Sequence, residues 1–273
     1  MFKNLLILFF FVFLSFIKSQ TYRVIYDFKY KRDSLSEITN TSKMVLQIGE
    51  KNTKFYYHSL LKADSIYKRG STISLSFPLN QIIKREKDSY INENYFSLKN
   101  NYFVYSSSDN IQWKITKLTK ELNGYKVQQA ETNWGGRIWI AWFCKDIPIN
   151  EGPYKFKGLP GLIMEIEDTK KNFKYSLETL EKIVTEYNTE NIVENNFGNK
   201  PLKINIERYN KLLLDNYNNP FDEYKNMKDG TWGLEIFDKE IRTQEGLKEI
   251  IKDYQKNIKK NYNPIELDKI VKY

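Results

Sequence analysis

The sequence predicts a β-rich α+β protein, in which C-terminal helices pack on a curved antiparallel sheet arranged as a meander or half-barrel. Two observations favour this fold class. The 273 residues include 20 Tyr, 17 Phe and 5 Trp, and aromatic residues suit sheets more than helical bundles. Apolar and polar residues alternate along much of residues 20–200, whereas the apolar spacing becomes helical in residues 201–273. These two ranges are therefore predicted to be a β domain and a helical C-terminal region.

Residues 1–19 have the three regions of a secretory signal peptide. Lys3 supplies a positive charge, residues 5–14 are an unbroken apolar run, and Ser19 is a small residue before polar sequence. A membrane-spanning helix needs about 20 apolar residues, and Lys18 ends this run too early for an anchor. We expect cleavage after Ser19. Because no cysteine near Ser19 could carry a lipid, the expected product is a soluble protein of the periplasm or the exterior, without stable membrane insertion.

The first strands are predicted between residues 21 and 59. Residues 21–30 alternate clearly. Residues 43–48 and 53–59 flank a Gly-Glu-Lys-Asn stretch, which is typical of a hairpin. Residues 64–100 are less regular and predict one or two strands with a long loop.

Consecutive strands with turn signals between them then predict an antiparallel meander. Asn123-Gly124 is the dipeptide preferred at a tight hairpin turn, and Gly135-Gly136 offers a second turn. One strand is apolar on both faces, so we expect it at the centre of the sheet. The predicted strands are residues 111–115, 125–132, 137–144 (the central one), 162–167 and 173–177.

Two helices are predicted after the strands. Residues 204–217 carry apolar side chains near helical spacing, and Pro220 closes the segment. Residues 243–262 repeat the pattern with a single apolar stripe. We expect both helices to cover a face or an edge of the sheet.

The segment between the third and fourth strands of the meander is rich in turn residues. Residues 146–163 hold three of the seven prolines and three of the twelve glycines. Pro160-Gly161 predicts a type II turn, because proline presets φ and glycine accepts the positive φ that follows.

At this segment the chain resembles the GLPGLI family, which is named for a motif formed here by Gly158, Leu159, Pro160, Gly161, Leu162 and Ile163. The resemblance covers residues 110–183 and includes Gly135-Gly136-Arg137, Trp139, Ala141-Trp142-Phe143, Ile147-Pro148, Gly152-Pro153 and Lys155-Phe156. It implies an exported protein of Bacteroidota from a largely uncharacterised family, and it implies no particular activity. Val127 departs from the pattern, since many relatives are expected to carry a cysteine there.

Composition argues against several classes of function. The formal net charge of +9 is spread along the chain and interrupted by acids, so no nucleic-acid partner is expected. The single cysteine, Cys144, follows Trp142-Phe143 and is expected to be buried and inert. The single histidine, His58, is predicted in a strand, and neither a zinc set nor a phosphate-binding loop occurs. We therefore predict no catalytic residue, no metal and no cofactor.

Arg137, Trp139 and Trp142 are the candidate ligand-binding residues. Arg137 begins the aromatic strand that holds both tryptophans. Its guanidinium could pair with an acid such as Asp146 or bind a ligand anion.

Three hypotheses of function remain. The leading one is a binding or accessory protein, in which the aromatic face of the sheet holds an apolar ligand or an extended peptide beneath the helices. The second is a carboxylate-dependent hydrolase that uses Glu165 and Glu167, whose side chains share one face of a strand. The third is a structural partner of an envelope complex.

Overall fold

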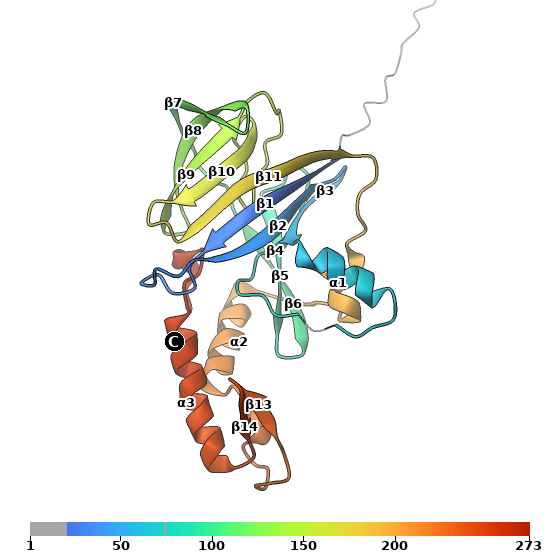
Figure 1. Cartoon of the computed structure of the whole chain (residues 1–273), viewed down its shortest axis with the longest axis vertical. Helices are drawn as coiled ribbons and strands as arrows, with labels where there is room; N and C mark the ends of the chain where they lie inside the picture. Colours follow the sequence, from blue (N-terminus) through green and yellow to red (C-terminus); the bar gives the residue numbers. More distant parts are fainter. Residues whose placement is uncertain (1–20, 74) are drawn as a thin grey trace, which may run out of the picture.

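The computed structural model describes residues 21–73 and 75–273, and within them twelve strands form one sheet that does not close into a barrel (Figure 1). The signal peptide predicted for residues 1–19 lies outside the described residues. The strands are β1 (Thr21–Tyr30), β2 (Asn40–Ile48), β3 (Asn52–Tyr57), β4 (Ile82–Glu86), β5 (Ile91–Leu98), β6 (Asn101–Ser108), β7 (Lys114–Leu122), β8 (Tyr125–Trp134), β9 (Arg137–Cys144), β10 (Leu162–Asp168), β11 (Phe173–Ile183) and β12 (Leu202–Ile204).

The sheet consists of two meanders joined along β1. The strand order is β12-β6-β5-β4-β3-β2-β1-β11-β10-β9-β8-β7, so β1 to β6 and β7 to β11 each run in sequence order. β1 pairs with β11 from Thr21, opposite Ile183, to Tyr30, opposite Phe173. Only β12 is parallel to its neighbour, β6, among the strands of this sheet in the described residues. The predicted β-rich class and the order of the second meander are confirmed. The first strand of that meander is Lys114–Leu122 rather than residues 111–115, and β6 was not predicted.

Local turn chemistry fixes the register of this second meander. Asn123 and Gly124 have φ values of +51° and +78°, and they join Leu122 of β7 to its cross-strand partner Tyr125 of β8. Both positive angles match the tight hairpin turn that the dipeptide predicts. β9 lies between β8 and β10, so it is an interior strand, but it is third from the β7 edge rather than central. One of its faces is partly exposed, with Ile138 at 53%, so the expected burial of both faces is wrong.

Three α-helices accompany the sheet in the described part of the chain. α2 (Ile206–Asn218) and α3 (Gln244–Lys260) agree with the prediction, and Asn205 and Thr243 cap them by accepting hydrogen bonds from backbone amides. α1 (Ser59–Tyr67) was not predicted. The strand expected to reach residue 59 ends at Tyr57. α1 was not predicted because its nine residues show too little helical periodicity.

α2 packs on the sheet, and α3 completes a second small core. Tyr209 of α2 lies edge-on to Phe96 of β5, with ring centroids 4.7 Å apart. Leu247 and Ile250 of α3 pack with Phe221 and Trp232 instead. Figure 1 shows both helices extending beyond one end of the sheet, beside the hairpin of β13 (Leu234–Ile236) and β14 (Lys239–Ile241). Short helical turns occupy Glu190–Glu194, Asn196–Gly198, Asp222–Tyr224 and Leu267–Lys269.

The main core lies between one aromatic face of the sheet and the loop from β9 to β10. Tyr175 stacks on Phe28 at 4.4 Å, and Trp139 lies 4.7 Å from Phe156 of the loop. The loop, which contains the motif Gly158–Ile163, is therefore folded across the sheet.

No helix within residues 21–73 and 75–273 has the length and apolar content needed to cross a bilayer.

Candidate functional site

The signature motif Gly158–Ile163 locks the loop onto the start of β10. The backbone N–H of Gly161 donates to the Leu159 carbonyl at 2.8 Å, and that of Leu162 donates to the Ile147 carbonyl at 3.1 Å. A type II turn would give Gly161 a φ of about +80° and pair Leu162 with Leu159, whereas the φ of Gly161 is +150°, so the predicted turn at Pro160-Gly161 is wrong. The tertiary hydrogen bond to Ile147 displaces the local one.

Gly161 is required by a close approach of two backbones. Its φ is +150°, and a Cβ atom at this position would lie 2.0 Å from the carbonyl oxygen of Cys144, the last residue of β9. Ile163 also holds the motif against the sheet, because its carbonyl accepts a hydrogen bond from the Tyr26 hydroxyl of β1 at 2.7 Å. The motif therefore holds the loop in place through close backbone packing and hydrogen bonds.

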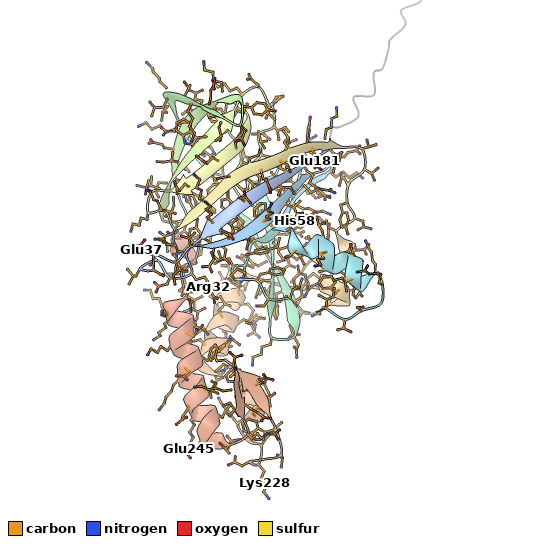
Figure 2. All side chains as sticks on the ribbon, viewed as in Figure 1. Arg32, Glu37, His58, Glu181, Lys228 and Glu245 are labelled. Carbon is orange, nitrogen blue, oxygen red and sulfur yellow. The ribbon has the colours of Figure 1, made fainter. Side chains whose placement is uncertain are left out.

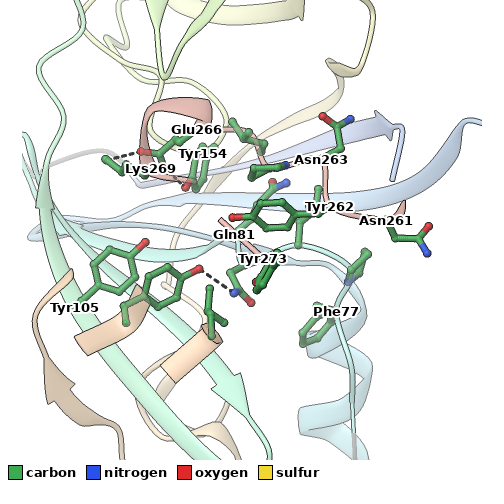
Figure 3. A pocket seen from close by; sticks show the side chains of 17 residues that line it. Phe77, Gln81, Tyr105, Tyr154, Asn261, Tyr262, Asn263, Glu266, Lys269 and Tyr273 are labelled. Carbon is green, nitrogen blue, oxygen red and sulfur yellow. Dashed lines mark hydrogen bonds and ion pairs between the residues drawn. The ribbon is translucent and has the colours of Figure 1, made fainter. Parts of the chain in front are cut away.

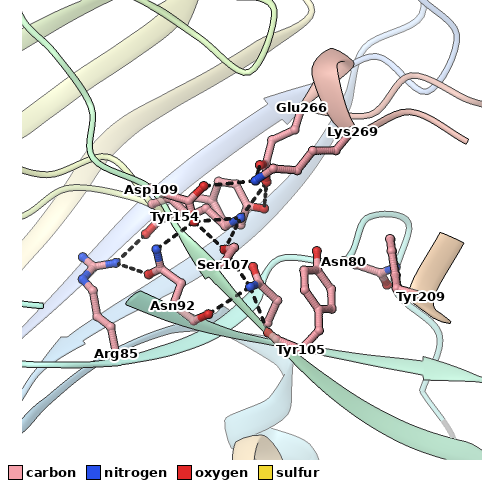
Figure 4. Close-up of polar contacts among 12 residues, drawn as sticks. Asn80, Arg85, Asn92, Tyr105, Ser107, Asp109, Tyr154, Tyr209, Glu266 and Lys269 are labelled. Carbon is pink, nitrogen blue, oxygen red and sulfur yellow. Dashed lines mark hydrogen bonds and ion pairs between the residues drawn. The ribbon is translucent and has the colours of Figure 1, made fainter. Parts of the chain in front are cut away.

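The loop places charged side chains in the interior, where they form what we call the ion cluster. Figure 4 shows part of it, with Arg85, Asp109, Glu266 and Lys269 labelled. Glu151, Lys155 and Lys157 are only 5%, 1% and 3% exposed, so their charges must be balanced by ion pairs inside the protein. The ion cluster consists of Arg85, Asp109, Glu151, Lys155, Lys157, Glu266 and Lys269.

One end of the ion cluster centres on Glu151. Arg85 forms a buried ion pair with this carboxylate, and the Nζ atom of Lys157 lies 3.5 Å from it. Arg85 also donates to the carbonyl of Tyr154 at 3.0 Å. Asn92 connects this end to the other by donating to Asp109 at 3.1 Å.

The other end joins the loop to the C-terminal segment, residues 261–273. Lys155 lies 2.8 Å from Glu266 and 3.3 Å from Asp109, and Lys269 also pairs with both carboxylates. Burial acts to raise the pKa of Asp109 and of Glu266, but the two lysines hold both pKa values below their usual range. Both carboxylates are therefore ionised at neutral pH, and they form ion pairs with Lys155 and Lys269.

A cavity of about 280 Å³ lies beside this end, between the sheet, α2 and the C-terminal segment (Figure 3). We call it the tyrosine pocket. Its aromatic lining residues are Phe77, Tyr105, Tyr154, Tyr209, Tyr262 and Tyr273.

The tyrosines of the pocket are neutral hydrogen-bonding groups. Burial raises the pKa of Tyr209 to about 12, and it raises the pKa values of Tyr105 and Tyr154 further. The Tyr154 hydroxyl donates a hydrogen bond to the Glu266 carboxylate at 2.7 Å, and this bond joins the pocket wall to the ion cluster. The pocket therefore offers ring faces and phenol hydroxyls without a phenolate charge.

Gln81, in the wall of the pocket, has one unsatisfied polar atom. This residue lines the cavity and is 1% exposed. Its Oε1 atom accepts from the Tyr175 hydroxyl at 2.6 Å, whereas its Nε2 atom has no acceptor among the described residues. A buried donor left without an acceptor costs about 1–3 kcal/mol. The Nε2 atom itself has almost no accessible surface, so it is buried in the wall rather than exposed to the cavity.

The three predicted binding residues do not form a common surface. Arg137 and Trp139 are buried on the inner face of β9, while Trp142 points to the opposite face, with Lys120 4.3 Å from its ring. The ionic partner of Arg137 is Asp168 at 3.3 Å, rather than the suggested Asp146.

Arg137 also fastens the C-terminal segment. It donates to the Asn263 side chain at 2.7 Å and to the carbonyls of Pro264 and Ile265 at 2.8 and 3.0 Å. Arg137 thus anchors the segment that forms one wall of the tyrosine pocket.

The residues weighed for catalysis lie elsewhere. His58 is exposed between β3 and α1, not within a strand as expected (Figure 2). Glu165 lies 2.8 Å from Lys120 and 2.9 Å from Lys174. Burial favours a raised pKa for Glu165, yet these lysines hold its pKa below the usual range, opposite to the shift that a general acid needs.

Cys144 is buried beside Val127 and Met164, as predicted. Its position among apolar side chains agrees with a packing role.

Sequence reasoning missed the tyrosine pocket, because its residues come from distant segments of an aromatic-rich chain. Gln81 precedes β4, Tyr105 lies in β6, Tyr209 in α2 and Tyr262 after α3. The only local signal was the charged set Glu151, Lys155 and Lys157 within an otherwise apolar loop.

Comparison with known proteins agrees with the fold and leaves the activity open. Residues 93–165 match the family described as "Protein of unknown function (Porph_ging)". No curated protein matches the sequence. Two solved structures of PNGF-II, in space groups C2 and P21, are similar at a TM-score of 0.53 and 14% identity, over 72% of this chain and 33% of theirs. The chain thus spans a third of their length, and the likeness shows the fold alone. The matched family region runs from β5 into β10 and includes the signature motif and the loop of the ion cluster.

Proposed function

We propose that this chain is an exported, GLPGLI-like binding or accessory protein of the Bacteroidota periplasm, and that its ligand site is the tyrosine pocket. One observation carries the proposal: a cavity of about 280 Å³ is lined by the side chains of six aromatic residues that come from distant segments of the chain. Small-molecule sites are typically apolar and aromatic cavities with a few polar groups that orient the ligand. The class of ligand expected from the sequence is an apolar molecule or an extended peptide.

The framework around the pocket supports a site formed before the ligand arrives. Arg137 and the ion cluster hold the C-terminal segment against the sheet with buried, charge-assisted contacts. A wall held in this way loses little freedom when a ligand binds, so less of the interaction energy is spent on ordering the site. A binding role also needs no catalytic group, whereas a hydrolase would need an acid with a raised pKa where Glu165 has a lowered one.

Filling the pocket should abolish binding. Leu213 of α2 lines the tyrosine pocket, whereas its neighbour Leu214 does not line it and is 37% exposed. We expect ring compounds and short peptides, screened by saturation-transfer NMR, to include ligands that bind the wild type. Leu213→Trp should lose them because the larger ring occupies the cavity, and the matched control Leu214→Trp should keep them. The proposal fails if no compound binds the wild type, or if both variants bind alike.

Export is tested separately. The protein recovered from the periplasm of expressing cells should begin at Gln20 by N-terminal sequencing, since cleavage is expected after Ser19. Leu8→Arg places a charge within the apolar run and should leave the uncleaved chain in the cytoplasm. An intact Met1 in the periplasmic or membrane fraction of the wild type would contradict cleavage.

A further inference from the structure

We propose that the start of β9 and the loop after it form a peptide-binding groove, which residues 263–267 of the same chain occupy as an intramolecular ligand. A free peptide of the same chemistry, an asparagine followed by an apolar residue and a glutamate, is expected to displace this occupant. The residues of the groove are Gly135, Gly136, Arg137, Tyr154 and Lys155. This inference goes beyond the proposed function and does not require a ligand in the tyrosine pocket.

The groove recognises the main chain of its occupant. Arg137 donates to the carbonyls of Pro264 and Ile265 at 2.8 and 3.0 Å. Residues 262–266 form neither a helix nor a strand, so these carbonyls have no partner in secondary structure and are satisfied by the groove instead. Hydrogen bonds to the main chain supply affinity in many peptide-recognition sites, while side-chain pockets supply specificity.

Two glycines let the occupant approach the turn between β8 and β9. A Cβ atom on Gly135 would lie 3.2 Å from the Cα atom of Glu266, and one on Gly136 would lie 3.0 Å from the Cβ atom of Leu267. The Gly135 carbonyl also accepts from the backbone N–H of Leu267 at 2.6 Å. The absence of a side chain at both positions therefore serves the contact with the occupant as well as the turn.

Two side chains at the start of the occupant are recognised individually. Asn263 accepts a hydrogen bond from Arg137 at 2.7 Å and donates one to the Lys31 carbonyl at 2.8 Å. Ile265 is 5% exposed and belongs to the main core. The groove therefore selects an amide at the first of these positions and an apolar side chain at the second.

Glu266 gives the groove a preference for an acidic residue. Its carboxylate lies 2.8 Å from the Nζ atom of Lys155 and accepts from the Tyr154 hydroxyl at 2.7 Å (Figure 4). Both contacts are charge-assisted, which makes them stronger than contacts between neutral groups. A peptide with glutamine at this position should therefore bind more weakly.

The groove and its occupant come from different parts of the chain. The residues of the groove lie within residues 93–165, which match the family of unknown function, whereas residues 263–267 lie outside that region. The β13–β14 hairpin and α3, which precede the occupant, pack in the second small core. This arrangement favours a groove that also accepts a segment other than its own occupant.

The first test loosens the occupant and leaves the groove intact. In the full chain, Ile265→Ser removes the buried apolar side chain, whereas the control Ile270→Ser changes a residue of the same segment that is 42% exposed. The probe is a fluorescein-labelled peptide of residues 262–269, Tyr-Asn-Pro-Ile-Glu-Leu-Asp-Lys, measured by fluorescence anisotropy. A linked segment competes at an effective concentration on the order of millimolar, so the wild type should bind the peptide weakly. Ile265→Ser should bind it about tenfold or more tightly than the wild type, and Ile270→Ser should resemble the wild type.

Equal binding by the two variants overturns the inference, and so does a lack of binding to Ile265→Ser. The Glu266→Gln peptide should bind Ile265→Ser about tenfold more weakly than the original peptide, and equal binding of the two peptides also overturns the inference.

The second test alters the groove in the Ile265→Ser protein. Adding Gly136→Ala should abolish binding of the labelled peptide, because the new Cβ atom meets the occupant. The matched control is Gly124→Ala: Gly124 has a similar φ of +78° in a hairpin turn, but no atom of the described residues lies within 4 Å of an added Cβ. This control should keep the binding. If the two glycine variants bind alike, the peptide does not occupy the proposed groove.

The wild type decides if Ile265→Ser does not fold. Unlabelled peptide at about 10 mM, above the effective concentration of the linked segment, should then speed amide hydrogen exchange in residues 263–269 about tenfold or more, as measured by mass spectrometry. A peptide with the same residues in scrambled order should leave the exchange unchanged. Unchanged exchange with the original peptide, or equal effects of the two peptides, overturns the inference.

Discussion

Gly161→Ala is expected to lower the free energy of unfolding by about 3 kcal/mol or more, as measured by urea denaturation. The alanine Cβ would lie 2.0 Å from the Cys144 carbonyl oxygen, so β9 and the loop must move apart. The backbone also has a φ of +150°, which side-chain-bearing residues rarely adopt. Steric overlap and backbone strain act together at this position.

Gly158→Ala is the matched control within the same motif. Gly158 also has a positive φ, +96°, but the nearest atoms to an added Cβ are 3.9 Å away, in ordinary contact. This variant should lose only about 1 kcal/mol, from backbone strain alone. Equal losses in the two variants, or an unchanged Gly161→Ala protein, would contradict the close approach.

The elements that the sequence predicted are those that local chemistry determines. Strict alternation and the Asn123-Gly124 turn specify the second meander, and apolar spacing with a capping residue specifies α2 and α3. α1 was not predicted because its nine residues show too little helical periodicity. The parallel strand β12 escaped because three residues carry no pairing signal.

The site was not predictable because distant contacts determine it. The proline-glycine pair favours a type II turn locally, but the Ile147 carbonyl takes the Leu162 amide. Arg137 was given a partner nine residues away, Asp146, yet it is bound by Asp168 and by a segment more than 120 residues further along the chain. Such contacts leave no periodic trace in one sequence.

Lys155→Met is expected to destabilise the protein by about 3–5 kcal/mol at about pH 7, because it removes the more deeply buried of the two cations that Asp109 and Glu266 share. Lys155 is 1% exposed and lies 2.8 Å from Glu266 and 3.3 Å from Asp109. Lys120→Met is the control: Lys120 pairs with Glu165 at a half-exposed position, and its loss should cost less than about 1 kcal/mol. A similar small loss for Lys155→Met would mean that the ion cluster does not support the fold.

The pH dependence of this loss identifies its electrostatic origin. In the wild type, burial favours raised pKa values for Asp109 and Glu266, but Lys155 and Lys269 hold both below the ordinary range. Their contribution to stability is therefore present above the unfolded pKa values of about 4 and is lost as the pH falls through the folded ones. Without Lys155, Lys269 alone opposes the effect of burial, so both pKa values rise, and the variant recovers relative to the wild type as the carboxylates become protonated. Urea denaturation at about pH 7 and about pH 4 should show the difference in unfolding free energy shrinking in acid. If the difference is the same at both pH values, Lys155 stabilises the protein by packing alone.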